Sequence, residues 1–162
     1  MKKIILFTIF AIGFNAYAQV ELKGIMIGSK FKGSQKDLMV RTSVAEINGE
    51  IFIAILKDST ISGVMFLPID ENNNELKISE VDEERVKLGM EKKYGITFIK
   101  ELNDSPLVDY FYKANKDGIK YVIVITKNKY LVNSIGLNIL IYNDELAKRG
   151  DREKQKKVNN DF

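Results

Sequence analysis

The sequence predicts a single α+β domain, in which a curved antiparallel sheet of about seven or eight strands packs on one central helix. Apolar runs separated by turn residues occur both before and after residues 79–94, and those residues form the only strongly marked helix in the interior of the chain. Strands grouped on either side of one helix favour α+β over the regular strand–helix alternation of α/β folds. A charged C-terminal helix or tail follows over residues 143–162.

The central helix is predicted over residues 79–94 from signals at both of its ends. Ser79 and Asp82 have the spacing of a capping box, and further acidic residues fill the first turn. Lys92 and Lys93 occupy the last turn, and Gly95 follows as a left-handed cap. Capping and the helix dipole explain the acidic start without any catalytic role. The apolar positions are Ile78, Val81, Val86, Leu88, Met90 and Tyr94. They spread over a wide arc, which predicts either a helix contacted from two sides or exposed apolar groups.

The segment before the helix reads as strands. A short strand is predicted over residues 20–27, and a polar loop follows it over 29–36. Three neighbouring strands are then predicted over residues 38–47, 50–57 and 60–67. Asn48-Gly49 is predicted to form a type I′ turn between the first two, because both residues tolerate positive φ. Pro68 ends the third strand.

Four more strands are predicted after the helix, over residues 96–102, 107–114, 119–126 and 134–142. Asp117-Gly118 is the clearest turn among them. The 119–126 strand is apolar on both faces, which predicts a central strand covered on both sides. In the 107–114 strand, Tyr110 and Tyr112 alternate with Phe111, and one face is expected to be half exposed.

Residues 1–18 have the three parts of a secretory signal peptide. Lys2 and Lys3 are followed by an apolar run of about the length of an h-region, and Ala16-Tyr17-Ala18 fits the cleavage rule. Cleavage is predicted between Ala18 and Gln19. The run is shorter than the ~20 residues of a membrane span, and no cysteine follows it for lipid attachment. We expect a soluble protein exported to the periplasm or beyond, with no membrane span in the mature chain.

The Ala-Tyr-Ala-Gln ending of this segment resembles the signal-peptide ends of small exported Bacteroidota proteins, and the frequent Lys, Ile and Asn are typical of an A+T-rich bacterial genome. The resemblance covers only the first nineteen or so residues. It implies an exported bacterial protein and no particular activity.

Charge gives little support for a nucleic-acid partner. The full chain has a formal net charge of +3, of which Lys2 and Lys3 contribute two. Between residues 148 and 157 there are six basic and two acidic side chains. A solvated C-terminal helix or tail explains this bias best, and contact with an acidic partner or an anionic surface is the alternative.

The absence of Cys and His closes several enzymatic routes. Thiol nucleophiles, Ser-His-Asp triads, His-bound zinc and imidazole acid–base catalysis all require one of these residues. Paired carboxylates and Ser-Lys arrangements remain available, but the acidic residues lie mainly in turns and at the helix start. We therefore predict no catalytic residues, no cofactor and a non-enzymatic role.

The one metal-like run is residues 70–75. Asp70, Asn72 and Asn74 match three ligand positions of a calcium loop. Glu75 stands where that loop needs glycine, and Val81 stands where it needs a bidentate glutamate. A polar turn is the favoured interpretation, and no metal site is predicted.

Tyr110, Phe111 and Tyr112 are the best candidate contact surface, because aromatic residues on a half-exposed strand suit protein or sugar binding. Core packing under the helix is the competing interpretation. The first functional hypothesis is an exported protein-interaction or envelope accessory domain of unknown specificity. The alternative is a small carrier of an apolar ligand, with a cavity lined by the sheet. A filled interior with an apolar surface patch would favour the first hypothesis, and an enclosed apolar cavity the second.

Overall fold

The computed structural model describes residues 20–104, 107–127 and 135–160, so the predicted signal peptide (1–18) and its Ala18–Gln19 cleavage site lie outside the described residues. The fold is α+β, as predicted. Its centre is a seven-stranded antiparallel sheet with the strand order β3-β4-β5-β9-β8-β7-β6. The strands are β3 (Met39–Val44), β4 (Ile47–Ile55), β5 (Ile61–Pro68), β6 (Ile99–Leu102), β7 (Tyr110–Lys116), β8 (Ile119–Lys127) and β9 (Ile135–Asn143).

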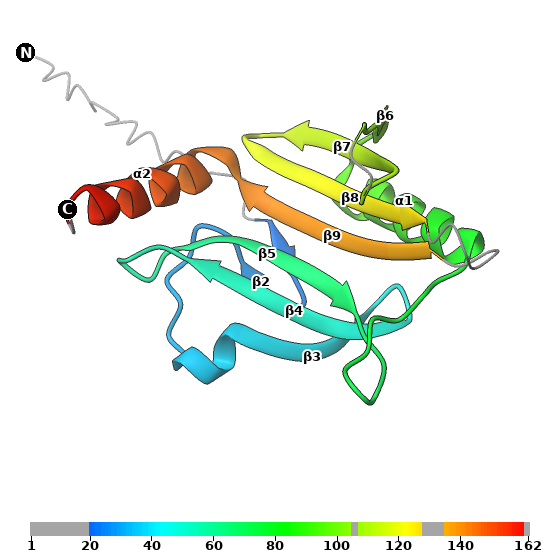
Figure 1. The fold of residues 1–162 in the computed structure, drawn as a ribbon, viewed down its shortest axis with the longest axis horizontal. Coiled ribbons are helices and arrows are strands. Elements are labelled where there is room, and N and C mark those ends of the chain that lie inside the picture. Colours follow the sequence, from blue (N-terminus) through cyan, green and yellow to red (C-terminus); the bar gives the residue numbers. More distant parts are fainter. Residues whose placement is uncertain (1–19, 105–106, 128–134, 161–162) are drawn as a thin grey trace, which may run out of the picture.

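The sheet consists of two meanders that meet in its middle. Strands β3 to β5 form the first and strands β6 to β9 form the second, and β5 pairs with β9 through four residues on each strand. Helix α1 (Glu80–Tyr94) connects them, because the chain must pass from β5 to β6 at the far edge. Figure 1 views the sheet from the side opposite α1, which lies behind β7 and β8. We call the side that α1 covers the inner face and the opposite side the outer face.

A short N-terminal hairpin completes the cover of the inner face. Strand β1 (Glu21–Leu22) pairs with β2 (Ile25–Met26), and Leu22 and Ile27 belong to the buried core. The Tyr94 hydroxyl at the end of α1 donates a hydrogen bond of 3.0 Å to the carbonyl oxygen of Glu21. A single 3₁₀ turn, η1 (Gln35–Leu38), leads into β3.

The inner face holds a filled core. Its fully buried members include Ile51, Phe66, Val86, Tyr121, Ile123, Ile125, Leu137, Ile139 and Ile141. On β8 they alternate with residues of the outer face, as the period of two in a strand requires. The central position of β8 is confirmed. Its expected cover on both sides is not found, because Val122 and Val124 on the outer face are only half-buried.

The helix boundaries agree with the predicted signals. Ser79 is the N-cap and accepts a hydrogen bond from the Asp82 amide, while the Asp82 carboxylate accepts one from the Ser79 amide. Gly95 ends α1 with φ 61° and ψ 48°. The turn at Asp117-Gly118 is also confirmed, with φ of 52° and 75°.

The prediction of a turn at Asn48-Gly49 is wrong. The turn lies at Ala45-Glu46, where both residues have positive φ, and Asn48 and Gly49 are inside β4. A Cβ on Gly49 would lie 2.4 Å from the Leu67 carbonyl oxygen and 2.6 Å from the ring of Phe66. The absence of a side chain therefore lets Phe66 lie across β4 in the core. Core packing sets the register here and overrides the local turn preference.

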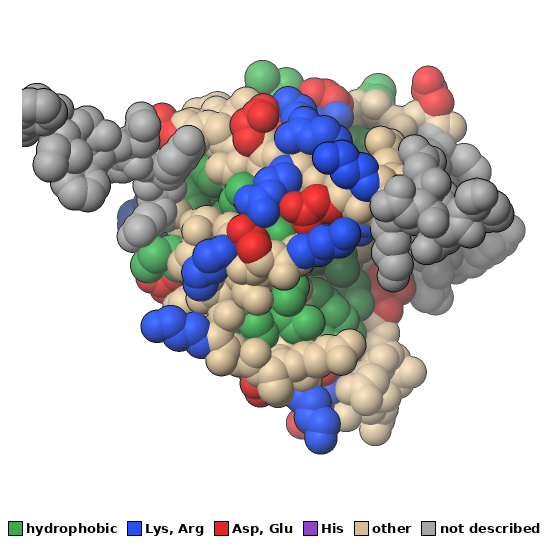
Figure 2. Space-filling view, turned by 90° about the vertical axis from the view of Figure 1, so that its left-hand side faces the viewer, with side chains coloured by type: hydrophobic (Ala, Val, Ile, Leu, Met, Phe, Trp, Pro, Cys, Tyr) green, Lys and Arg blue, Asp and Glu red, His purple; other side chains and the backbone are tan. Residues whose placement is uncertain are grey.

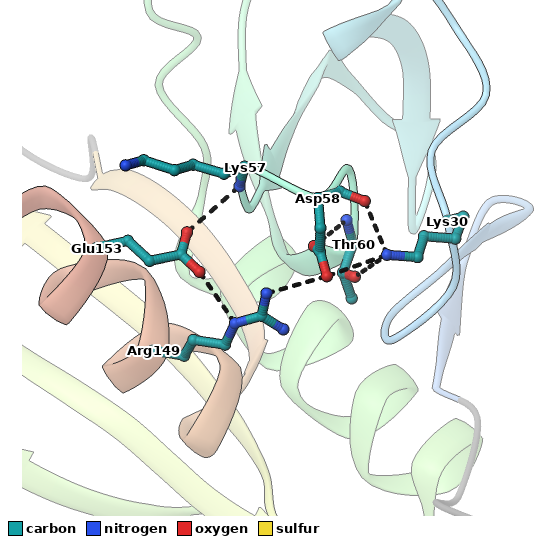
Figure 3. A network of polar contacts seen from close by, with 6 residues as sticks. All are labelled: Lys30, Lys57, Asp58, Thr60, Arg149 and Glu153. Carbon is teal, nitrogen blue, oxygen red and sulfur yellow. Dashed lines mark hydrogen bonds and ion pairs between the residues drawn. The ribbon is translucent and has the colours of Figure 1, made fainter.

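The C-terminal segment forms helix α2 (Asp144–Asn160), which the polar network in Figure 3 fixes to the β4–β5 turn. Arg149 donates hydrogen bonds of 3.0 Å to the carboxylates of Asp58 and Glu153. Lys30 forms an ion pair of 3.1 Å with Asp58 from the other side. Hydrogen bonds from Thr60 and Lys30 hold the pKa of Asp58 well below its usual range. The ion pairs therefore dock a helix that has few apolar groups.

Candidate functional site

The outer face carries a cross-strand row that spans all seven strands. The strand register pairs one residue of each strand with one on the next, and so forms a row of seven: Met39, Phe52, Met65, Leu140, Val122, Lys113 and Ile99. Opposite residues in antiparallel strands project from the same face. Six of these seven side chains are apolar. With strands about 4.8 Å apart, the row is roughly 30 Å long.

The row is accessible along its length. Met39 and Ile99 at the two ends are 53% and 68% exposed, and Met65 near the middle is 36% exposed. Phe52, Val122 and Leu140 are half-buried. Helix α2 contacts this side of the sheet over one corner. We call these seven residues the outer row.

The charged residues beside the outer row are largely paired. Arg41 forms an ion pair of 3.7 Å with Glu50, and Lys120 forms one of 2.7 Å with Asp144. Lys113 pairs with Glu101 across β6 and β7. An apolar centre with a satisfied polar rim has the composition of a protein-binding patch.

A groove lies where α2 crosses the corner of the outer face, and its volume is about 490 Å³. Phe52, Ala54, Met65, Leu140 and Tyr142 form the sheet side of the groove. Ala147, Gly150, Asp151 and Lys154 contribute from α2. Figure 2 views the molecule from the end where α2 projects, and it shows Lys and Arg side chains gathered above an apolar hollow.

The three aromatic residues predicted as a contact surface are split between the two faces. Tyr110 is 6% exposed and Tyr112 is half-buried, and both point under α1. Core packing, the competing interpretation, therefore holds for these two tyrosines. Phe111 projects from the outer face beside the outer row, with the Lys113 ammonium 4.9 Å from its ring centroid. Only Phe111 remains a candidate for partner contact.

Tyr110 and Tyr112 meet a buried carboxylate that sequence reasoning did not single out. Glu83 of α1 is 6% exposed and accepts hydrogen bonds of 2.9 and 3.0 Å from Tyr110 and of 2.9 Å from Tyr112. The sequence contains one signal of its burial. Glu83 lies three residues before Val86 and seven before Met90, which puts it on the same buried face of the helix. Capping and dipole effects alone do not explain this one acidic residue.

The surroundings of the two tyrosines favour their neutral forms. Burial raises the pKa of Tyr112 to about 12, and its hydrogen bond to Glu83 acts in the same direction. Burial and the same carboxylate also raise the pKa of Tyr110. The Lys100 ammonium lies 3.6 Å from the centroid of the Tyr110 ring and adds a cation–π contact. The cluster ties α1 to β7, and all of its hydrogen-bonding groups act within the fold.

Helix α1 also has an exposed apolar side. Val81 is 76% exposed and Leu88 is 53% exposed, whereas Val86 and Met90 are buried. The wide apolar arc predicted from sequence therefore contains a core stripe and two solvent-facing residues. This patch is small compared with the outer row.

The 70–75 segment forms a tight polar turn. The Asp70 carboxylate accepts hydrogen bonds of 2.8 Å from the amides of both Asn72 and Asn74. Hydrogen bonds from Asn74 lower the pKa of Asp70. The carboxylate is thus directed at its own backbone. Within the described ranges, no three acidic side chains come together as a metal-binding group.

Comparison with protein-family models, with curated proteins and with solved structures found no match to this chain. None of the helices in the described part has both the length and the apolar character needed to cross a bilayer.

Proposed function

We propose that this chain is an exported, non-enzymatic protein that binds a protein partner through the outer face of its sheet. The observation that carries the proposal is the outer row, in which six of seven residues are apolar and which the described residues cover only at the corner beside α2. Contiguous apolar surface of this kind marks interaction sites in monomeric proteins. Export rests on the predicted signal peptide, and the expectation of no enzymatic role rests on the absence of Cys and His.

The filled interior supports partner binding over the alternative of an apolar-ligand carrier. Ile51, Ile123 and Ile141 in the middle of the sheet are 0% exposed, and their side chains occupy the space that a sheet-lined cavity would need. The groove beside α2 lies on the surface of the sheet. An open apolar surface suits a macromolecular partner, because a carrier gains affinity by enclosing most of its ligand.

The test is an affinity purification with protein obtained after expression of the full chain, using envelope and culture-medium fractions of the producing cells. The double variant Phe52→Ala, Met65→Ala removes two apolar members of the outer row. The matched control is Val81→Ala, Leu88→Ala, which removes two exposed apolar groups from α1. We expect one protein partner to be recovered by the wild type and by the control, and lost by the outer-row variant.

Recovery of the same partner by the outer-row variant would contradict the proposal. Co-purified lipid without any protein partner would contradict it as well, and would support the carrier alternative. Circular dichroism of both double variants verifies that the α+β fold is retained, so that a loss of binding reports on the surface.

A further inference from the structure

The outer face carries a second cross-strand row beside the outer row. From edge to edge it consists of Arg41, Glu50, Leu67, Asn138, Val124, Phe111 and Glu101. Leu67 lies next to Asn138, because these two residues come one position beyond the last pair of β5 and β9. The row lies on the side of the outer row away from α2, which begins beyond the C-terminal end of β9. We call these seven residues the second row.

The outer row matches its own reversed copy. β9 is the middle strand of the seven, so a reversal about β9 exchanges β3 with β6, β4 with β7 and β5 with β8. The pairs that result are Met39 with Ile99, Phe52 with Lys113, Met65 with Val122, and Leu140 with itself. Three of these four pairs are apolar on both sides, and the fourth sets an ammonium against an aromatic ring, which is a favourable cation–π arrangement.

The second row matches its reversed copy as well. The pairs are Arg41 with Glu101, Glu50 with Phe111, Leu67 with Val124, and Asn138 with itself. The Arg41 and Glu101 side chains are 51% and 49% exposed, at opposite edges of the sheet. Arg41 pairs with Glu50 in its own sheet, and Glu101 pairs with Lys113. Reversal joins these two pairs into a line of alternating charge at each edge of the face.

Asn138 lies at the centre of the second row with an unused hydrogen-bonding group. Its Oδ1 atom is buried and has no hydrogen-bond partner among the described residues. A buried acceptor without a donor is unfavourable. The residue as a whole is half-buried, so rotation about χ2 can turn its amide toward the surface. On a twofold axis, the Nδ2 of each Asn138 can donate to the Oδ1 of the other.

The outer face is large enough for a stable interface. Its seven strands, about 4.8 Å apart, give a width of about 30 Å, and the four outward positions along β8 span about 20 Å. These dimensions correspond to roughly 600 Å² on each copy and roughly 1,200 Å² in total, which is at the lower limit for stable, specific interfaces. The relief of the side chains adds to this flat outline.

We infer that the protein partner is a second copy of this chain, packed outer face to outer face about a twofold axis parallel to β9. The inference rests on the proposed function and names the partner of the same surface. Twofold interfaces use one self-complementary patch on both copies, and the two rows form such a patch. Two packed sheets lie about 10 Å apart with their strands within about 30° of each other. An axis along the outer row would instead set Lys113 against Lys113 of the second copy.

The first test measures the mass of the protein, purified after expression of the full chain, by sedimentation equilibrium between about 1 and 100 μM. We expect a dimer. Leu140→Lys sets two ammonium groups against each other at the axis, and should raise the dimer dissociation constant roughly tenfold or more. Leu88→Lys, at an exposed apolar position of α1, is the matched control and should leave it unchanged. A monomeric wild type, or equal dissociation constants for the two variants, would overturn the inference.

The isosteric variant Asn138→Asp tests the axis with little change of shape. It sets two carboxylates against each other, and the dissociation constant at neutral pH should again rise roughly tenfold or more. An unchanged dissociation constant would mean that Asn138 is not at the axis, and would overturn the arrangement.

Cross-linking tests the direction of the axis at two exposed positions. The chain has no Cys, so each introduced thiol is unique. A bismaleimide linker of about 10 Å, the spacing of packed sheets, should join the Met39→Cys protein to the Ile99→Cys protein once the two have exchanged subunits. Neither protein should be linked to itself, because like positions are about 30 Å apart across the dimer. Self-linkage of the Met39→Cys protein, or no linkage in the mixture, would overturn the twofold arrangement.

Failure of this inference can be told apart from failure of the proposed function. If the inference holds, the partner recovered by affinity purification is the chain itself. A monomeric wild type that recovers a different protein, and loses it in the variant Phe52→Ala, Met65→Ala, would overturn the inference alone. A monomeric wild type that recovers no protein, or one that the same variant retains, would overturn the outer face as a binding surface too.

Discussion

The inner and outer faces of the sheet are built from the same strands, yet they use apolar residues differently. On the inner face Phe66 and Ile123 are 0% exposed, beneath cover that α1 and the β1–β2 hairpin provide. On the outer face the neighbouring residues Met65 and Val122 are half-buried or more exposed, and α2 lines a groove with Met65 at one corner. Apolar composition alone therefore does not locate the core. The cover that each face receives decides which apolar residues are buried in the core and which stay accessible to solvent.

The largest expected effect is on the free energy of unfolding, when one phenylalanine on each face is replaced by alanine. Phe66→Ala on the inner face should lower the free energy of unfolding by roughly 3–5 kcal/mol, because it leaves a cavity in a filled core. Phe52→Ala, on the adjacent strand but on the outer face, should cost only about 1 kcal/mol. Urea denaturation followed by circular dichroism measures both. Similar losses of unfolding free energy for the two variants would mean that the outer face is packed as tightly as the inner face, and would contradict the difference between them.

The next effect concerns the polar contact that holds α1 to the inner face. Glu83→Ala removes the acceptor of both tyrosine hydroxyls, and we expect a loss of about 1–3 kcal/mol in unfolding free energy. Glu83→Gln keeps one acceptor oxygen and should lose less. Glu84→Ala, at the exposed neighbouring position of the same helix, is the matched control. If Glu83→Ala behaved like Glu84→Ala, the cluster would contribute nothing to stability.

The tyrosines of the inner face should also make stability depend on alkaline pH. The pKa of Tyr112 is about 12 in the folded protein and about 10 when unfolded, so the folded state holds its proton more tightly. This contribution is fully present below pH 10 and is lost as the pH rises toward 12. Urea midpoints measured over that interval should fall less steeply for Tyr112→Phe than for the wild type. Parallel curves for the two proteins would exclude Tyr112 as a source of the dependence.

The smallest expected effect is on the docking of α2, on the outer side of the sheet, as the pH is lowered. The pKa of Asp58 is lowered by its hydrogen bonds, so its contribution is present above the ordinary aspartate pKa and is lost as the pH falls below that value. We expect amide exchange of α2, normalised to the intrinsic rate, to accelerate in acid before that of α1 does. Asp58→Asn should make the α2 amides exchange faster at neutral pH and remove most of the acid dependence. Simultaneous acceleration of both helices in every protein would show that Asp58 does not control the docking of α2.

Much of the fold could be predicted because local signals agree with it. The capping box at Ser79, the left-handed Gly95 and the turn at Asp117-Gly118 act over a few residues, and each is where the pattern predicted. The turn at Asn48-Gly49 failed because packing of Phe66 over Gly49 outweighs the local preference. That contact joins two strands, and no short sequence window contains it.

The candidate site was less predictable than the fold. The sequence pointed to Tyr110, Phe111 and Tyr112, but alternation along β7 sends two of them under α1 and leaves Phe111 on the outer face. The apolar residues on both faces of β8 predict cover on both sides, but Val122 and Val124 on the outer face are only half-buried. Whether an apolar face is buried or exposed depends on whether a second layer packs on it. The sequence of the strand alone does not show this.

The sequence by itself determined the α+β class, the extent of α1 and which residues alternate on each strand, because caps, turns and periodicity are local properties of the chain. Only the tertiary structure decided that Met39, Phe52, Met65, Leu140, Val122 and Ile99 form one row with Lys113. Those residues come from seven strands, and their alignment depends on register and strand order. The tertiary structure also decided that α2 covers just one corner of that row. An ion pair between Arg149 and Asp58 and a hydrogen bond from the Lys57 amide to Glu153 hold it there, and both join residues more than ninety positions apart in the chain.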